Sequence, residues 1–94
     1  MLYNIKQLLE SVITDSIVKK YSLTQVGNSI GFNEKEQKWY GWSHRAVASF
    51  GIGDKIFEED FGDDNTPFVK HGSQPIKTLD DAKKSALKFS DYVS

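Results

Sequence analysis

The sequence predicts an α+β fold: a small antiparallel β-sheet of three to four strands, flanked by an N-terminal and a C-terminal helix packed on one face. Apolar residues recur at helical spacing near both ends of the chain, and short aromatic or β-branched runs lie between them. The 94 residues contain no internal repeat and suffice for one domain, residues 1–94, with a modest core. Two amphipathic helices need a common surface to cover, which a small sheet provides.

The N-terminal segment is expected to form a helix from about Asn4 to Lys20. Its apolar residues recur every three or four positions: Ile5, Leu8, Leu9, Val12, Ile13, Ile17 and Tyr21. Asn4 is a suitable N-cap residue, and Gln7 three positions later completes a capping-box pattern.

The middle of the chain predicts the strands. Residues 22–32 form either a loop or a short strand, because glycines interrupt them. Residues 30–32 and 38–42 are expected to pair as a hairpin around the polar loop 33–37. Residues 46–50 give a third run, which ends in the glycine-bearing turn 51–54.

Two further segments are expected to belong to the sheet. The last segment of the chain is expected to form the second helix. Residues 55–57 are expected to continue the sheet and residues 68–70 to form a short edge strand. A helix is expected from Leu79 to Tyr92, with Thr78 as N-cap and two aspartates in the first turn, where the helix dipole favours anions. Its apolar stripe consists of Leu79, Ala82, Ala86, Phe89 and Val93.

Composition excludes several classes of function. The formal net charge of −1 argues against a direct nucleic-acid binder, which normally has a basic excess. The absence of cysteine excludes disulfides, thiolate metal sites and a cysteine nucleophile. Neither a signal peptide nor a membrane-spanning run is recognisable, so we expect a cytoplasmic protein without membrane contact. No motif implies a cofactor or a metal.

The most informative stretch runs from Lys38 to Arg45, which holds both tryptophans and the only arginine. Because side chains alternate along a strand, Trp39 should face one side and Tyr40, Trp42 and His44 the other. One interpretation places Tyr40 and Trp42 in the core, with Trp39 covering an edge. The other gives the exposed aromatic a role in recognition, since aromatic residues and arginine are enriched at binding hot spots.

The sequence Ser43-His44-Arg45 does not indicate serine catalysis, because neighbours on a strand point apart and cannot form a nucleophile–base pair. His44 and Arg45 could together hold an anion, or they form a solvent-exposed pair. The residues between 54 and 70 include six acidic and two basic side chains. Their acidic run is a solvated loop, a patch that docks on a basic groove of a partner, or a cation site.

The motifs around residues 31–54, with Trp42-Ser43-His44-Arg45-Ala46 at their centre, and those around residues 77–93 resemble a group of small phage and prophage proteins. The resemblance does not include the N-terminal helix and implies no catalytic residues. It implies a mobile-element setting, in which small single-domain proteins inhibit bacterial defence, anti-CRISPR proteins among them.

We therefore expect a non-enzymatic, anti-CRISPR-like inhibitor that binds a bacterial defence protein or complex in the host cytoplasm. The expected contact residues are Trp39, Tyr40, Trp42, His44, Arg45, Glu58, Glu59, Asp60, Asp63 and Asp64. The alternative is a small nucleotide- or anion-binding module, in which a base stacks on a tryptophan and Arg45 and His44 hold the phosphate. A sheet with exposed edges and both helices on one face could also form a homodimer through its bare face.

Overall fold

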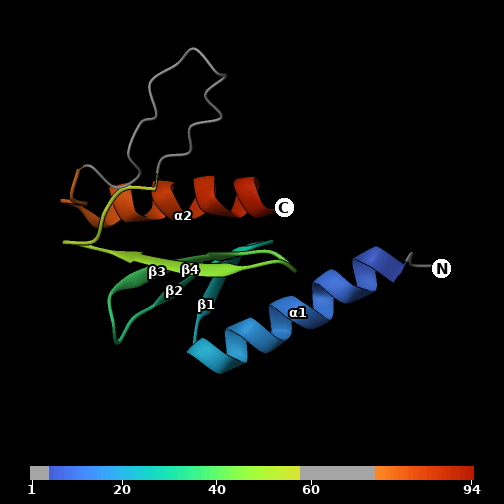
Figure 1. Ribbon diagram of the computed structural model, residues 1–94. Helices are drawn as coiled ribbons and strands as arrows, with labels where there is room; N and C mark the ends of the chain where they lie inside the picture. The colour runs from blue at the N-terminus through green and yellow to red at the C-terminus, as the bar shows by residue number, and fades with distance from the viewer. Residues whose placement is uncertain (1–4, 58–73) are drawn as a thin grey trace, which may run out of the picture.

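The computed structural model describes residues 5–57 and 74–94, with side chains from residue 11 onward in these ranges. The elements are α1 (Ile5–Tyr21), β1 (Thr24–Gly27), β2 (Ile30–Asn33), β3 (Lys38–Trp42), β4 (Val47–Gly51) and α2 (Leu79–Val93). The strands form one antiparallel sheet in the order β1-β2-β3-β4 (Figure 1). The α+β class and both helices are confirmed, and the segment read as loop or strand contains β1.

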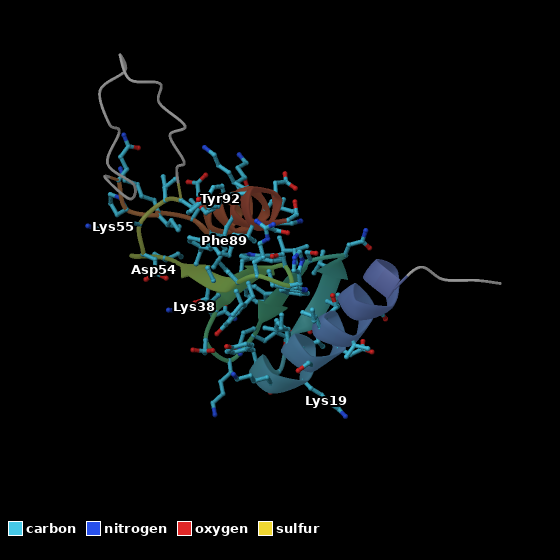
Figure 2. All side chains as sticks on the ribbon, turned by 45° about the vertical axis from the view of Figure 1, so that its right-hand side comes forward. Lys19, Lys38, Asp54, Lys55, Phe89 and Tyr92 are labelled. Atoms are coloured by element: carbon cyan, nitrogen blue, oxygen red, sulfur yellow. The ribbon has the colours of Figure 1, made fainter. Side chains whose placement is uncertain are left out.

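The two helices cover opposite faces of the sheet, which corrects the expectation that both pack on one face (Figure 1). Lys19 on α1 and Phe89 on α2 accordingly lie on opposite sides of the sheet in Figure 2. The physical reason lies in β3, whose large aromatic residues point to both sides. A sheet that is apolar on both faces needs cover on both.

Helix α2 packs closely over β3 and β4. It begins as predicted, because the Thr78 hydroxyl accepts a hydrogen bond from the Asp81 backbone N–H at 3.1 Å. Ala82 and Ala86 are fully buried, and Gly41 of β3 lies directly beneath Ala86. A side chain at position 41 would collide with the helix backbone, so small residues on both elements permit the close approach. The core here consists of Ile30, Phe50, Ile76, Ala82 and Ala86.

Helix α1 packs on the other face through its C-terminal half. Its half-buried residues there are Ile17, Val18 and Tyr21, which contact a buried cluster of Leu23, Tyr40 and Trp42. The helix ends at Tyr21, and Ser22 after it adopts a left-handed conformation with φ of 56°. Toward its N-terminus α1 extends past the edge of the sheet, and Val12 is 65% exposed (Figure 1).

The chain leaves the sheet after β4. The expected turn forms, and Gly53 adopts a φ of 94° that favours glycine. Residues 55–57 do not continue the sheet: Lys55 makes an isolated bridge with Pro75, and Phe57 packs on the α2 side of the core. The edge strand expected at residues 68–70 lies outside the described residues. In the part of the chain that is described, neither helix is long and apolar enough to cross a membrane.

Candidate functional site

The aromatic stretch divides between the two faces of the sheet as strand alternation predicts. Tyr40 and Trp42 point toward α1 and are buried, with Trp42 only 1% exposed. Trp39 points toward the α2 side and is half-buried. The interpretation that makes Tyr40 and Trp42 core residues therefore holds, and Trp39 is the tryptophan that a partner could reach.

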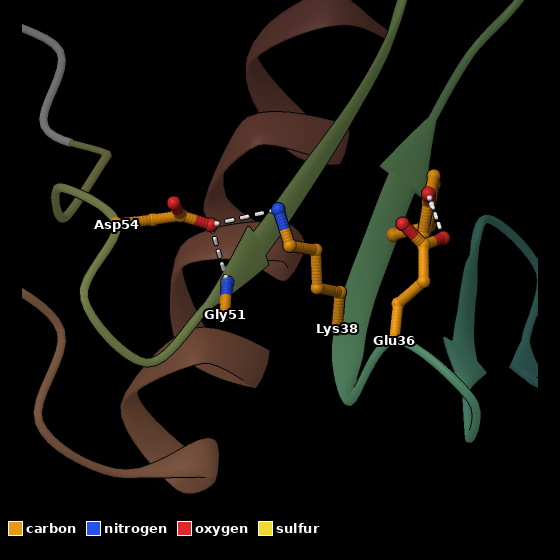
Figure 3. Close-up of polar contacts among 5 residues, drawn as sticks. Glu36, Lys38, Gly51 and Asp54 are labelled. Atoms are coloured by element: carbon orange, nitrogen blue, oxygen red, sulfur yellow. Dashed lines mark hydrogen bonds and ion pairs between the residues drawn. The ribbon is translucent and has the colours of Figure 1, made fainter.

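The polar atoms of the two buried aromatics are already engaged within the fold. The Trp42 indole N–H donates to the Thr14 hydroxyl on α1 at 3.1 Å. The Tyr40 hydroxyl donates to a Glu36 carboxylate oxygen at 3.0 Å (Figure 3). Burial raises the pKa of Tyr40, and the hydrogen bond to Glu36 and its negative charge raise this pKa further. These side chains tie α1 and the hairpin turn to the sheet, so neither is available for recognition while α1 is docked.

Trp39 belongs to a compact cluster on the α2 side. The ring of Phe32 on β2 lies 4.8 Å from the Trp39 ring, centroid to centroid. The Lys83 ammonium on α2 lies 5.1 Å from the Trp39 centroid, within the range of a cation–π contact. Three elements thus bring two aromatic rings and a cation together at a half-buried position.

Exposed apolar residues continue this cluster on both sides. Leu87 lies one helical turn beyond Lys83 on the same side of α2 and is 43% exposed. A β-bulge in β1 places Val26 and Gly27 opposite Ile30, which shares the α2 side with Phe32, and Val26 is 51% exposed. Helix α2 packs mainly over β3 and β4, and on β2 it buries Ile30 but leaves Phe32 half-buried. We call this set the Trp39 surface: Val26, Phe32, Trp39, Lys83 and Leu87.

His44 and Arg45 lie elsewhere, in the exposed turn that follows β3. The turn is fixed by the Ser43 hydroxyl, which donates to the Val93 carbonyl at 2.7 Å and accepts from the Arg45 N–H at 3.0 Å. Trp39 and this turn stand at opposite ends of β3, about 16 Å apart at the usual rise of a strand. Trp39 and the His44–Arg45 turn, which were expected to share one contact surface, therefore occupy two separate places.

An open groove of about 650 Å³ lies beside this turn, between α1 and the turn that joins β1 to β2. His44 lines it together with Asp15 and several hydroxyl and amide side chains, but Arg45 does not. Trp42 borders it yet is too buried to offer a ring face for stacking. The arrangement expected of a nucleotide module, with a base on a tryptophan and Arg45 and His44 at the phosphate, is therefore not formed here.

The acidic residues expected to contact a partner, which are Glu58, Glu59, Asp60, Asp63 and Asp64, lie outside the described residues. Within residues 11–57 and 74–94, whose side chains are described, His, Asp and Glu nowhere gather as three or more that could hold a metal ion.

Sequence reasoning did not identify Phe32 and Lys83 as neighbours of Trp39. The predicted five-residue loop would have paired Phe32 with Lys38, whereas the structure pairs Phe32 with Trp39 and Asn33 with Lys38. The Asn33 side chain accepts from the Glu36 N–H at 2.7 Å and shortens the turn by one residue. The ability of Asn33 to form this bond was the sequence feature that could have indicated the shorter turn, and with it the pairing of Phe32 with Trp39. Lys83 lies far from Trp39 in the sequence, and no local sequence pattern predicts the contact between them.

A family model described as Type I Thoeris inhibitor Tad6 matches residues 6–94, which is nearly the whole chain. No curated protein and no solved structure gives a significant match. The expectation of a phage anti-defence inhibitor is confirmed, whereas the anti-CRISPR assignment is wrong in detail, because the family acts against Thoeris. The chain belongs to the Tad6 family of type I Thoeris inhibitors.

Proposed function

We propose that this protein inhibits Thoeris in the host cytoplasm by binding a Thoeris protein through the Trp39 surface, without catalysing a reaction. The observation that carries the proposal is the contact of half-buried Trp39 with both Phe32 on β2 and Lys83 on α2, at the margin where α2 meets the sheet. Tryptophan and other large aromatics dominate the energetics of protein interfaces, and they act best when surrounding contacts exclude water.

The cluster is also pre-organised. The Trp39 ring packs against the core and against Phe32, so little side-chain freedom remains to be lost on binding. A partner that completes its burial gains about 25 cal/mol for each Å² of apolar surface removed from water. The chemistry of the surface favours a partner with an apolar segment for Val26 and Leu87 and a carboxylate for Lys83.

Binding accounts for the described side chains better than catalysis does. The hydroxyl groups suited to a nucleophile carry structural hydrogen bonds: Ser43 donates to the Val93 carbonyl and Ser90 to the Trp42 carbonyl. His44 lies exposed in a turn, and no hydrogen bond within the described residues orients its ring for acid–base work.

The proposal is tested with Lys83→Glu and a matched control, Lys88→Glu, which makes the same charge change on an exposed part of α2 away from Trp39. Each variant is titrated against each purified protein of a type I Thoeris system by interferometry and assayed for inhibition in cells that carry the system. Lys83→Glu should raise Kd at least about tenfold, because it removes the cation and opposes the partner carboxylate. Lys88→Glu should bind as the parent does.

Trp39→Ala should weaken binding further, although it also removes core packing, so its thermal unfolding is measured alongside. Equal binding by the parent, Lys83→Glu and Trp39→Ala would exclude the Trp39 surface. Inactivation of many Thoeris molecules by one molecule of the protein would contradict stoichiometric binding and point to catalysis.

A further inference from the structure

The two edges of the sheet differ in a way that bears on self-association. Strand β1 carries a bulge between Gln25 and Gly27, and the Gln25 side chain donates to the Gly27 carbonyl at 2.8 Å. Bulges of this kind interrupt an edge and protect it from pairing. Strand β4 is regular over five residues, Val-Ala-Ser-Phe-Gly, and contains no charge, proline or bulge. By the same rule it is an unprotected edge as far as residues 5–57 and 74–94 are concerned.

The hydrogen bonds of β4 show which backbone groups face outward. The Ser43 N–H donates to the Ala46 carbonyl at 2.9 Å, and bonded pairs alternate along an antiparallel ladder. The pairs of Ala48 with Gly41 and of Phe50 with Trp39 therefore carry the bonds to β3. Val47, Ser49 and Gly51 direct their N–H and C=O groups away from the sheet.

The bonds of Gly51 confirm this alternation, because its N–H and C=O groups point away from β3 and are both bonded to Asp54. The Gly51 N–H donates to an Asp54 carboxylate oxygen at 2.8 Å, and the Asp54 N–H donates to the Gly51 carbonyl at 3.0 Å (Figure 3). Within the described ranges, by contrast, no residue bonds to the outward N–H and C=O groups of Val47 and Ser49. Four backbone groups are thus left open in the middle of the edge.

We propose that a second copy of this chain pairs with this edge, β4 against β4 in antiparallel orientation, with the two-fold axis at Ala48. Val47 of each copy then pairs with Ser49 of the other, and all four open groups of each copy are bonded. The result is one continuous sheet that doubles the four strands of the single chain. This interface is separate from the Trp39 surface and does not depend on the proposed function.

Two observations favour a second copy over an unrelated strand. The open residues, Val47 and Ser49, are placed symmetrically about Ala48, whose small side chain suits the close approach of a non-bonded pair at the axis. The same register sets Arg45 against Gly51 of the second copy, whose outward groups are held by Asp54. Besides the Gly51 N–H, the Asp54 carboxylate contacts the Lys38 ammonium at 3.5 Å (Figure 3). The Asp54 side chain is still 41% exposed, so it can also receive the arginine.

A single cysteine tests the register directly, since the chain has none of its own. Residues paired across the axis lie about 4.5 Å apart between Cα atoms, which is within the range of a disulfide. The purified Ala48→Cys variant should therefore form a covalent dimer on mild oxidation. Ser49→Cys is the matched control, because it lies diagonally from its own equivalent and should remain monomeric. Equal cross-linking of both variants, or of neither, would overturn the register.

Proline at position 49 tests the hydrogen bonds without breaking the ladder to β3, because the Ser49 N–H points outward. By analytical ultracentrifugation the parent should sediment as a dimer, and Ser49→Pro should dissociate with a Kd at least about tenfold higher. Ser49→Ala controls for the hydroxyl, and circular dichroism checks that each variant is folded.

Arg45→Glu should raise the same dimer Kd, whereas Arg45→Lys should change it less. A monomeric parent at high concentration would overturn the proposal, and cross-linking of Ala48→Cys to a Thoeris protein would then assign the edge to that partner.

Discussion

The two faces of the sheet are covered in different ways. On one face, α2 buries Ala82 and Ala86 completely and lies against Gly41, so backbone approaches backbone with little side chain between them. On the other face, the described residues of α1 are at most half-buried, and large sheet residues such as Trp42 reach out to meet them. Helix α2 is therefore part of the core. Helix α1 covers the other face, and among its described residues Ile17, Val18 and Tyr21 make its apolar contacts with the buried cluster there.

This difference predicts a difference in local stability. Segments with few buried apolar contacts open at a lower free energy than the core does. Helix α1 should thus detach more readily than α2, and its opening would expose Tyr40 and Trp42 while the rest of the sheet remains folded. Substitutions on the two faces test this contrast.

Gly41→Val should destabilise the protein most, by about 3 kcal/mol or more, because the new side chain meets the Ala86 backbone and α2 must shift. Chemical denaturation measures the loss. The control is Gly31→Ala on the α1 side, where the nearest atoms include the Leu23 side chain at 3.1 Å and the Trp42 ring at 3.3 Å, and part of this contact can relax. Comparable losses in the two variants would show that the faces are equally rigid.

Trp42→Ala should cost about 3 kcal/mol, at the lower end of the range for a buried tryptophan, because α1 can settle into the space. Hydrogen exchange should show faster opening of α1 with little change in α2. Trp42→Phe retains most of the ring and should cost less, since it mainly removes the bond to Thr14. Equal acceleration of exchange in both helices would contradict the independence of α1.

Thr14→Val removes the hydrogen bond from Trp42 to α1, together with the long 3.4 Å bond from the Thr14 hydroxyl to the Asn28 carbonyl. The Trp42 N–H loses its acceptor, but the adjoining groove admits water, so the expected cost is only about 1 kcal/mol. Thermal unfolding and hydrogen exchange in α1 measure it. A loss as large as that of Trp42→Ala would mean that the bond, and not the ring, holds the helix.

The sequence predicted the elements well because each depends on local pattern. The apolar stripe of α2, the Thr78 cap and the alternation around Trp39 appear in the structure. In α1, the predicted apolar residues Ile17 and Tyr21 pack on the sheet, but Val12 is exposed. The sequence did not predict which face of the sheet each helix covers. Amphipathicity shows that one side of a helix is buried, but it does not show against which face of the sheet. The aromatic residues on both sides of β3 were a usable signal, because neither side of such a strand can face water.

The candidate site was predicted only in part, and for a related reason. Trp39 could be selected from alternation, but its cluster with Phe32 and Lys83 depends on a hairpin register and a helix position fixed by tertiary packing. His44 and Arg45 are close to Trp39 in sequence and far from it in space, because an extended strand carries neighbours apart quickly. Residues that are close in the sequence of a strand should therefore not be assumed to form one site.

The smallest expected effect concerns Tyr40, on the α1 face. Burial and Glu36 raise its pKa above the ordinary value of 10.0, so the folded state keeps the proton that the unfolded state releases first. The stability that this tyrosine contributes is present below about pH 10 and is lost as the pH rises through 10 toward the folded pKa. Thermal unfolding from about pH 8 to 11 should therefore show a steeper alkaline decline for the parent than for Tyr40→Phe.

Glu36→Gln sharpens this last test, because it removes one cause of the raised pKa and leaves burial in place. Its alkaline decline should fall between those of the parent and Tyr40→Phe. If all three decline together, ionisation of Tyr40 is not resisted by the fold. The α1 face would then admit water around the ring, and the cover that α1 provides would be looser than its contacts with Tyr40 and Trp42 indicate.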